Sequence, residues 1–355
     1  MNIDERKRLI LQTVVDEFIR TGEPVGSNAV LSYLPMNVSS ATVRNDMAYL
    51  ERAGLLEQPH TSAGRVPTYV GYRYYIDHLM APKPLTSRER QLIDSLLYRG
   101  DLTADSVVDN AVNVLSELTN LAVVSRSNMP NFSVITRVEV IPAGRRLYAL
   151  LIITSSGAIK NKICRIEFDL TNDQLEFFEH FINENLSGVG IDSLTPAMLQ
   201  NLAVALGSYM LSLSPLLHAV YELSEEMSQA NIQLRGEQKL LVNQALRPEE
   251  IVTLLAHKDA LVELLNGALD GISVVFGKEN ESFAVTNSSM IVSPYRIGGE
   301  PVGSFGVIGP IRVDYSKVIP HIQYITDSVT RLLSDVIGEE DDERKDEDEP
   351  DEQDG

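Results

Sequence analysis

The chain has 355 residues, of which 44% are hydrophobic, so it is long enough for two or three globular domains with a sizeable core. Its single cysteine, Cys164, excludes an intramolecular disulfide and favours a reducing compartment. The charged N-terminus MNIDERKRL and the lack of any run of eighteen apolar residues predict a cytoplasmic protein without a signal peptide or membrane span.

The net charge of −20 is unevenly distributed along the chain. Residues 339–355 hold twelve acidic residues against two basic ones, whereas residues 1–80 hold nine acidic and eight basic residues. A nucleic-acid-binding region without a basic excess must depend on the placement of a few cations. We therefore expect any DNA binding by a single copy of residues 1–80 to be weak.

Two helices are predicted before residue 38. Residues 3–21 carry an apolar stripe at helical spacing, with Asp4 as a candidate cap and Gly22 as the stop. Ser27 can cap a short second helix, which Pro35 ends.

Residues 38–68 predict a third helix followed at once by a tight hairpin. Either Ser39 or Ser40 can cap the helix, and Gly54 ends it. The flanks of the hairpin, 55–59 and 66–68, bracket a polar tip. Three helices followed by a two-stranded ribbon are the order of a winged helix-turn-helix. The apolar residues expected to face the core from the third helix are Val43, Met47, Leu50 and Ala53.

The outer face of the third helix carries side chains that can read DNA. Arg44 can form a fork onto guanine or phosphate, Asn45 can pair with adenine, and Thr42 can contact a thymine methyl or a phosphate. The alternative is an ordinary solvated helix beside a surface loop. Arg73, in a tyrosine-rich helix expected over 69–80, could bind phosphate, although packing explains that helix equally well. The candidate DNA-contacting residues are Ser39, Ser40, Thr42, Arg44, Asn45, Tyr49, His60, Thr61, Ser62, Arg65 and Arg73.

These segments resemble the heat-inducible transcription repressor family HrcA. The similarity rests on SSATVRNDMAYLE, PHTSAGRVPT and GYRYYID in the first 80 residues, and on GSFGVIGPIRVDY near the other end. The resemblance implies a homodimeric repressor that binds an inverted-repeat operator upstream of chaperonin and Hsp70 operons. It also implies an N-terminal winged helix, a GAF-like domain and a dimerising domain inserted in the latter, with the chaperonin as a partner that keeps the repressor active.

After a stiff linker at 81–84, helices are predicted over 88–98 and 105–118. Strands follow at 121–125, 134–141, 145–154 and 158–168, and the last three have the turns of an antiparallel meander. Nothing in this region resembles a catalytic cluster.

Residues 172–265 are predicted to be mainly helical. The repeat of three and four over 196–213 suits a partner helix, while packing within one chain is an equal alternative. Pro215 is expected to break this segment before helices at 216–233 and 248–265, with a polar loop at 231–237. The candidate dimer-interface residues are Leu199, Leu202, Leu206, Tyr209 and Leu213.

Strands at 272–276, 288–294 and 301–309 and a helix at 314–337 complete the predicted fold. The glycines of 298–309 lack the lysine and serine of a phosphate loop, and the six histidines show no metal-binding spacing. We therefore expect an α+β multidomain protein with no catalytic residues, no metal and no cofactor. The expected domains are a winged helix at 1–80, a GAF-like domain at 81–143 and 266–338, an inserted, largely helical dimerisation domain at 144–265, and a disordered acidic tail at 339–355.

Several functions remain open at this level. The acidic tail is either a solvating appendage or a competitor of DNA for the winged helix. The main hypothesis is a dimeric repressor of heat-shock chaperone operons that binds double-stranded DNA, associates with no membrane, and is released on heat stress. The first alternative is a winged-helix repressor that responds to a small molecule in the GAF-like domain. An enzyme or an RNA-binding regulator is less well supported, because neither the residue spacing of a catalytic site nor exposed sheet aromatics are found.

Overall fold

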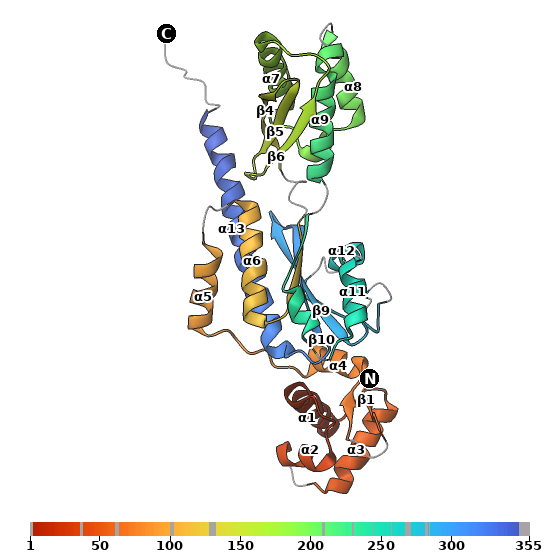
Figure 1. Ribbon diagram of the computed structural model, residues 1–355. Helices are drawn as coiled ribbons and strands as arrows, with labels where there is room; N and C mark the ends of the chain where they lie inside the picture. Colours follow the sequence, from red (N-terminus) through yellow and green to blue (C-terminus); the bar gives the residue numbers. More distant parts are fainter. Residues whose placement is uncertain are drawn as a thin grey trace.

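The computed structural model describes residues 3–35, 38–60, 64–99, 103–127, 133–207, 210–228, 231–243, 245–256, 258–266, 271–280, 283 and 285–347. These residues form three units in a row (Figure 1). The N-terminal unit is residues 3–80, the central unit is residues 85–127 and 231–347, and the inserted unit is residues 133–228. Helices and strands are mixed throughout, which confirms the α+β class.

The N-terminal unit consists of helices around a very short hairpin. Asp4 caps the first helix by accepting a hydrogen bond from the Lys7 amide (2.9 Å), and Gly22 ends it in the left-handed conformation (φ 74°). The hairpin has two pairs of residues, Leu56 with Pro67 and Glu57 with Val66. The elements are α1 (Glu5–Thr21), α2 (Ser27–Tyr33), α3 (Ser40–Arg52), β1 (Leu56–Glu57), β2 (Val66–Pro67) and α4 (Tyr69–His78).

The central unit is built on an antiparallel five-stranded sheet in the order β7-β3-β10-β9-β8. Because successive side chains of a strand point to opposite faces, Val123 joins one hydrophobic core and Val124 joins another. The strands are β3 (Ala122–Ser127), β7 (Asn231–Arg235), β8 (Ser273–Phe276), β9 (Ser288–Ile297) and β10 (Glu300–Pro310).

Helices cover both faces of this sheet (Figure 1). One face packs on α6 (Ala104–Thr119) and α13 (Tyr315–Glu347), and α5 (Ser87–Leu97) packs on these two helices. The other face packs on α10 (Glu237–Leu241), α11 (Pro248–Ala256) and α12 (Lys258–Asn266). The helix α13 continues to Glu347, and residues 348–355 lie outside the described residues. The disorder expected of residues 339–355 stays a prediction. None of the described helices is long and apolar enough to cross a lipid bilayer.

One hydrophobic core runs through both the N-terminal and the central unit. Tyr72 of α4 lies with its ring centroid 6.3 Å from that of Phe276 and 5.9 Å from that of Tyr315, and all three side chains are fully buried. Aromatic rings at these separations attract one another beyond the area they bury. The N-terminal unit is therefore packed firmly onto the central unit.

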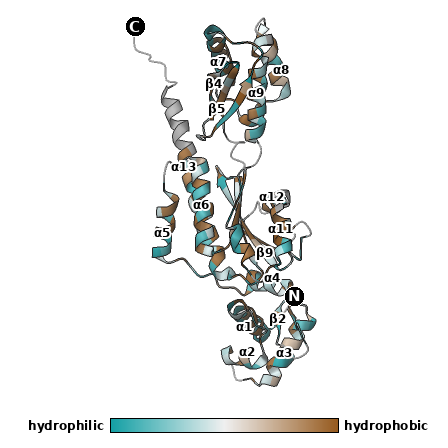
Figure 2. Cartoon of the chain, in the orientation of Figure 1, coloured by the Kyte–Doolittle hydropathy of each residue, from teal (hydrophilic) through white to brown (hydrophobic). Residues whose placement is uncertain are grey.

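The inserted unit has its own sheet and its own core. Its three strands are antiparallel in the order β4-β5-β6, and α7 and α9 pack against them. Figure 2 shows apolar residues along the strands of this unit. The elements are β4 (Ile135–Gly144), β5 (Leu147–Thr154), β6 (Ile159–Arg165), α7 (Asn172–Leu186), a 3-10 turn (Ile191–Ser193), α8 (Pro196–Ala205) and α9 (Met210–Ser228).

The strand pairing moves the limits of the inserted unit away from the predicted 144 and 265. The strand β4 belongs to this unit because it pairs with β5, and residues 231–265 belong to the central unit because β7 pairs with β3. The loop predicted at 231–237 is wrong for the same reason. Its polar residues alternate with Ile232 and Leu234, and the edge of β3 supplies hydrogen-bond partners that the sequence does not reveal.

The helix predicted over 196–213 is two helices, α8 and α9. Gly207 adopts the left-handed conformation (φ 56°) just after α8, while Pro215 lies inside α9 instead of ending a helix. The predicted dimer residues Leu202, Leu206 and Leu213 are only 5%, 2% and 0% exposed, so they form the core of the inserted unit. Leu199 packs partly buried against that core, and Tyr209 lies outside the described residues. The side chains of Leu202, Leu206 and Leu213 are therefore not available to a partner helix, and the alternative of packing within one chain accounts for them.

Candidate nucleic-acid interface

The helix α3 begins at a network of short polar side chains. Ser39 is the cap, since its Oγ accepts a hydrogen bond from the Thr42 amide (3.1 Å) and lies 2.9 Å from Thr42 Oγ1. Ser40 donates to Oδ1 of Asn28 (2.7 Å) and lies 3.2 Å from Ser27 Oγ. The starts of α2 and α3 are thus joined, and Asn28, which the sequence analysis missed, enters the site through its contact with Ser40.

The outer face of α3 is polar and open. Arg44 and Asn45 are exposed and make no hydrogen bond or ion pair with any of the described residues. Ala41 is also exposed and Ala48 is half-buried, so small side chains flank the two polar ones. A helix surface that carries small residues beside the polar Arg44 and Asn45 can approach a groove of duplex DNA closely.

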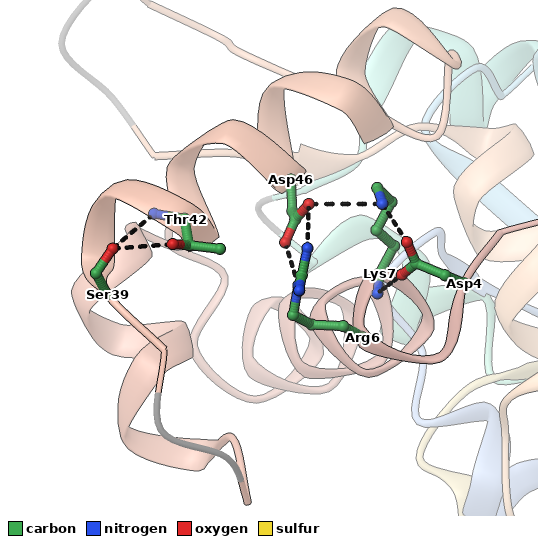
Figure 3. A network of polar contacts seen from close by, with 6 residues as sticks. All are labelled: Asp4, Arg6, Lys7, Ser39, Thr42 and Asp46. Atoms are coloured by element: carbon green, nitrogen blue, oxygen red, sulfur yellow. Dashed lines mark hydrogen bonds and ion pairs between the residues drawn. The ribbon is translucent and has the colours of Figure 1, made fainter.

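A buried carboxylate fixes α3 against α1 (Figure 3). Asp46, only 6% exposed, accepts hydrogen bonds from Arg6 Nε (2.7 Å) and Nη2 (3.3 Å), and its Oδ1 lies 3.6 Å from Lys7 Nζ. Lys7 also pairs with Asp4, and that hydrogen bond raises the pKa of Lys7. Because a buried charge that loses its partner is costly, this clamp holds the outer face of α3 at a fixed angle.

Tyr49 lies further along the same helix and is 39% exposed. Its ring lies 5.0 Å from Lys7 Nζ, at a distance typical of cation–π attraction. The structure therefore places Tyr49 at the margin between the outer face and the clamp.

The hairpin after α3 is anchored by its backbone and by an ion pair. Val25 and Arg65 exchange two backbone hydrogen bonds of 2.9 Å, and a Cβ atom on Gly64 would lie only 2.4 Å from the Val25 carbonyl oxygen, so only glycine fits there. Arg65 Nη2 lies 2.9 Å from Glu51 on α3, which satisfies much of the charge predicted to face DNA. His60 is exposed, while Thr61 and Ser62 lie outside the described residues.

Arg73 does not belong to this surface. It pairs with Glu279 of the central unit, donates to the Val274 carbonyl (2.9 Å), and its guanidinium lies 5.1 Å from the ring of Phe276. The structure does not favour the prediction that Arg73 contacts DNA, because its charge and its hydrogen bonds are engaged at the joint between the two units. The separation of more than 200 residues between these partners left no local signal in the sequence.

The space between the central sheet and α11 and α12 is filled by side chains. Met290, Leu265 and Val124 are buried in that core, and a Cβ atom on Gly306 would lie 2.9 Å from atoms of all three. Close packing of this kind leaves little room for an effector between sheet and helices. The geometry therefore does not favour the small-molecule alternative at this place.

Comparison with known proteins agrees with these features. The family model for the C-terminal domain of HrcA proteins matches residues 105–319. The heat-inducible transcription repressor HrcA of Acetivibrio thermocellus is 32% identical over 96% of this chain and 99% of its own length, and that of Clostridium botulinum is 34% identical over 94% and 99%. A crystal structure described as a hypothetical protein shares the fold, with a TM-score of 0.65 and 24% identity over 94% of this chain and all of that one. The chain therefore belongs to the HrcA family of heat-inducible transcription repressors.

Proposed function

We propose that this protein represses transcription by binding an inverted-repeat DNA operator as a homodimer, with α1 to α3 and the β1-β2 hairpin acting as a winged helix-turn-helix. The observation that carries the proposal is the open outer face of α3, where Arg44 and Asn45 have no partner among the described residues while the helix itself is clamped by Asp46. Polar side chains that have no hydrogen-bond partner within the described chain, on a rigidly held helix, suit recognition of an external polar ligand.

The second helix of a helix-turn-helix presents its N-terminal turns to the base edges of the major groove. There Arg44 can donate two hydrogen bonds to guanine and Asn45 can pair bidentately with adenine. Ser39, Ser40 and Thr42 lie at the positive end of α3, where amide groups and hydroxyls can hold a phosphate. Of the hairpin residues, His60 remains a candidate for contact with the DNA backbone.

Two copies are needed because one winged helix carries few cations. When one winged helix of a dimer is bound to a symmetric operator, the second meets its half-site at high effective concentration. Two weak contacts therefore give strong and selective binding. We propose that the operators lie upstream of the chaperonin and Hsp70 operons, that bound repressor occludes the promoter, and that heat releases it with the chaperonin as a partner. The names of the relatives, heat-inducible transcription repressors, support this choice of targets.

Fluorescence anisotropy with promoter fragments of the organism's own chaperonin operon tests the DNA contact. Arg44→Ala should cost about 1 to 3 kcal/mol on an inverted-repeat fragment and much less on shuffled DNA, as expected for a base contact. Arg52→Ala is the matched control, since Arg52 is exposed at the opposite end of α3 and should affect both fragments alike. Equal losses on both DNAs for Arg44→Ala would refute the base contact.

A further inference from the structure

A small pocket lies in the central unit, close to its joint with the N-terminal unit. Its walls come from the last turn of α6, the end of β10, the segment that joins β10 to α13, and the first turns of α13. Its volume is about 220 Å³, below the roughly 300 to 1,000 Å³ of pockets for drug-sized ligands. The pocket therefore has room for one small molecule, and it is separate from the filled space between the sheet and α11 and α12.

Two positive side chains of this pocket have no partner. Arg312 is half-buried and Lys317 is exposed, and neither side chain makes a hydrogen bond or ion pair with any of the described residues. Arg65 and Arg73, which are also half-buried, each pair with a glutamate. A guanidinium carries five N–H donors, and taking them out of water without a partner is costly. The half-buried Arg312 is thus suited to a partner from outside the chain.

The acidic side chains near the pocket do not compensate these two charges. Asp314, in the wall, pairs with Lys83 at 3.2 Å and accepts a hydrogen bond from Ser316 (2.5 Å). Glu89 lies 3.7 Å from His321 Nε2, but it accepts from the amide and the hydroxyl of Thr86, both at 2.8 Å, as part of the cap of α5. The pocket therefore holds two uncompensated positive charges in a chain whose total is −20.

Arg312 also lies against the N-terminal unit. A Cβ atom on Gly22 would lie 3.4 Å from Arg312 Nη1, so the guanidinium touches the residue that ends α1. The partial negative charge at the carboxyl end of a helix attracts such a cation, although no hydrogen bond forms here. Since α1 carries the Arg6 that clamps Asp46 of α3, a molecule held by Arg312 would contact the joint on which the winged helix is mounted.

We propose that this pocket binds a small organic phosphate monoester. A phosphate monoester carries about two negative charges at neutral pH, which match the two uncompensated positive charges. The planar guanidinium of Arg312 can donate to two phosphate oxygens at once, and Lys317 can bind the third as a point charge. Leu118, Leu121 and Val318 supply an apolar wall for the organic part of the ligand. This inference does not depend on the proposed contact between α3 and DNA.

Isothermal titration calorimetry of the full chain at low salt tests the proposal, with phenyl phosphate, inorganic phosphate and phenol as probes. Phenyl phosphate should bind at one site per chain and at least about tenfold more tightly than inorganic phosphate, because only the monoester has an apolar part to bury. Phenol lacks the charge and should not bind measurably. No binding of phenyl phosphate, or no preference for it over inorganic phosphate, would overturn the proposal.

Substitutions test which side chains hold the phosphate. Arg312→Gln should weaken the binding of phenyl phosphate at least about 30-fold, and Lys317→Gln about tenfold, because each removes charge-assisted hydrogen bonds. Lys278→Gln is the matched control. Lys278 is exposed and lines a neighbouring hollow that shares Arg312 with the pocket, so its loss should leave binding unchanged. Weaker binding with Lys278→Gln but not with Lys317→Gln would place the ligand in the other hollow and overturn the proposal.

Operator binding separates this site from the DNA contact. In the absence of a phosphate ligand, Arg312→Gln should bind the inverted-repeat fragment as the unmodified protein does, and a loss of affinity would overturn the proposal by assigning Arg312 to the DNA backbone. Arg44→Ala should lose operator affinity but keep its affinity for phenyl phosphate, so the failure of either proposal can be recognised. Far-UV circular dichroism checks that the variants fold, and the exposed Lys317 supplies the second variant if Arg312→Gln misfolds.

Discussion

The N-terminal unit and the inserted unit lie at opposite ends of the molecule and differ both in how they are attached and in what they expose (Figure 1). The N-terminal unit shares its core with the central unit and exposes the polar Arg44 and Asn45 on α3. The inserted unit keeps its own core and exposes isoleucines on a sheet. A polar surface on a rigidly mounted unit suits recognition of DNA, whereas an apolar surface on a separately packed unit suits association with protein.

The difference in attachment predicts two separate unfolding transitions. Tyr72→Ala removes a fully buried ring from the joint and should destabilise the N-terminal and central units together by about 3 to 5 kcal/mol. Differential scanning calorimetry should show a lower Tm for the transition of the N-terminal and central units and an unchanged Tm for that of the inserted unit. Tyr72→Phe is the control, because the Tyr72 hydroxyl is buried without a hydrogen-bond partner in the described chain, and its removal should be neutral or slightly stabilising.

The reciprocal substitution completes this test. Phe178→Ala in the inserted unit, where Phe178 is fully buried under the sheet, should lower only the other transition by a similar amount. A single transition that shifts with both Tyr72→Ala and Phe178→Ala would contradict the separation of the two cores.

A smaller effect is expected at the β4 edge of the inserted unit, which Asn183 of α7 closes by its hydrogen bonds to Val138. Asn183→Ala leaves the Val138 amide and carbonyl without their partner and should cost about 1 to 3 kcal/mol. It should also promote concentration-dependent aggregation, seen by light scattering, because an opened edge can pair with another chain. Asn185→Ala, on the same helix but bonded only to the exposed Phe181 carbonyl, should change neither. Aggregation of both variants alike would argue against a specific role of Asn183.

The smallest effect concerns the pH dependence of the N-terminal unit. Burial raises the pKa of Asp16 above its usual 3.8, although the hydrogen bond from Tyr75 (2.5 Å) opposes this. The folded state then holds its proton to higher pH than the unfolded state, so stability falls as pH rises through and just above that usual value. Asp16→Asn should abolish this fall in denaturant titrations, while still accepting from Tyr75.

A carboxylate with the opposite shift is the control for Asp16. The hydrogen bond from Arg20 lowers the pKa of Glu17, so the stability it contributes is present above the usual carboxyl value and is lost as pH falls. Glu17→Gln should therefore not change the decrease in the free energy of unfolding with rising pH. If Glu17→Gln also abolished that decrease, Asp16 could not be the residue responsible for it.

The local parts of the fold could be predicted from the sequence because their causes are local. The cap at Ser39, the core stripe of α3 and the stop at Gly22 follow from neighbouring residues, and the structure contains all three. The limits of the inserted unit could not be predicted, since they depend on β7 finding β3 across more than 100 residues. The contacts of Arg73 and the burial of the leucines on α8 and α9 could not be predicted for the same reason. Charge and periodicity do not determine which distant residue a side chain contacts.

The neighbouring ends of β3 and β7 have one further consequence. Ser127, the last residue of β3, is paired directly with Asn231, the first residue of β7, so the chain leaves the central sheet and re-enters it at a single point. A hairpin turn of two residues is enough to span such a pair. The inserted unit between these two strands is therefore modular. Evolution can lengthen, shorten or replace it without disturbing the central unit that supports α3.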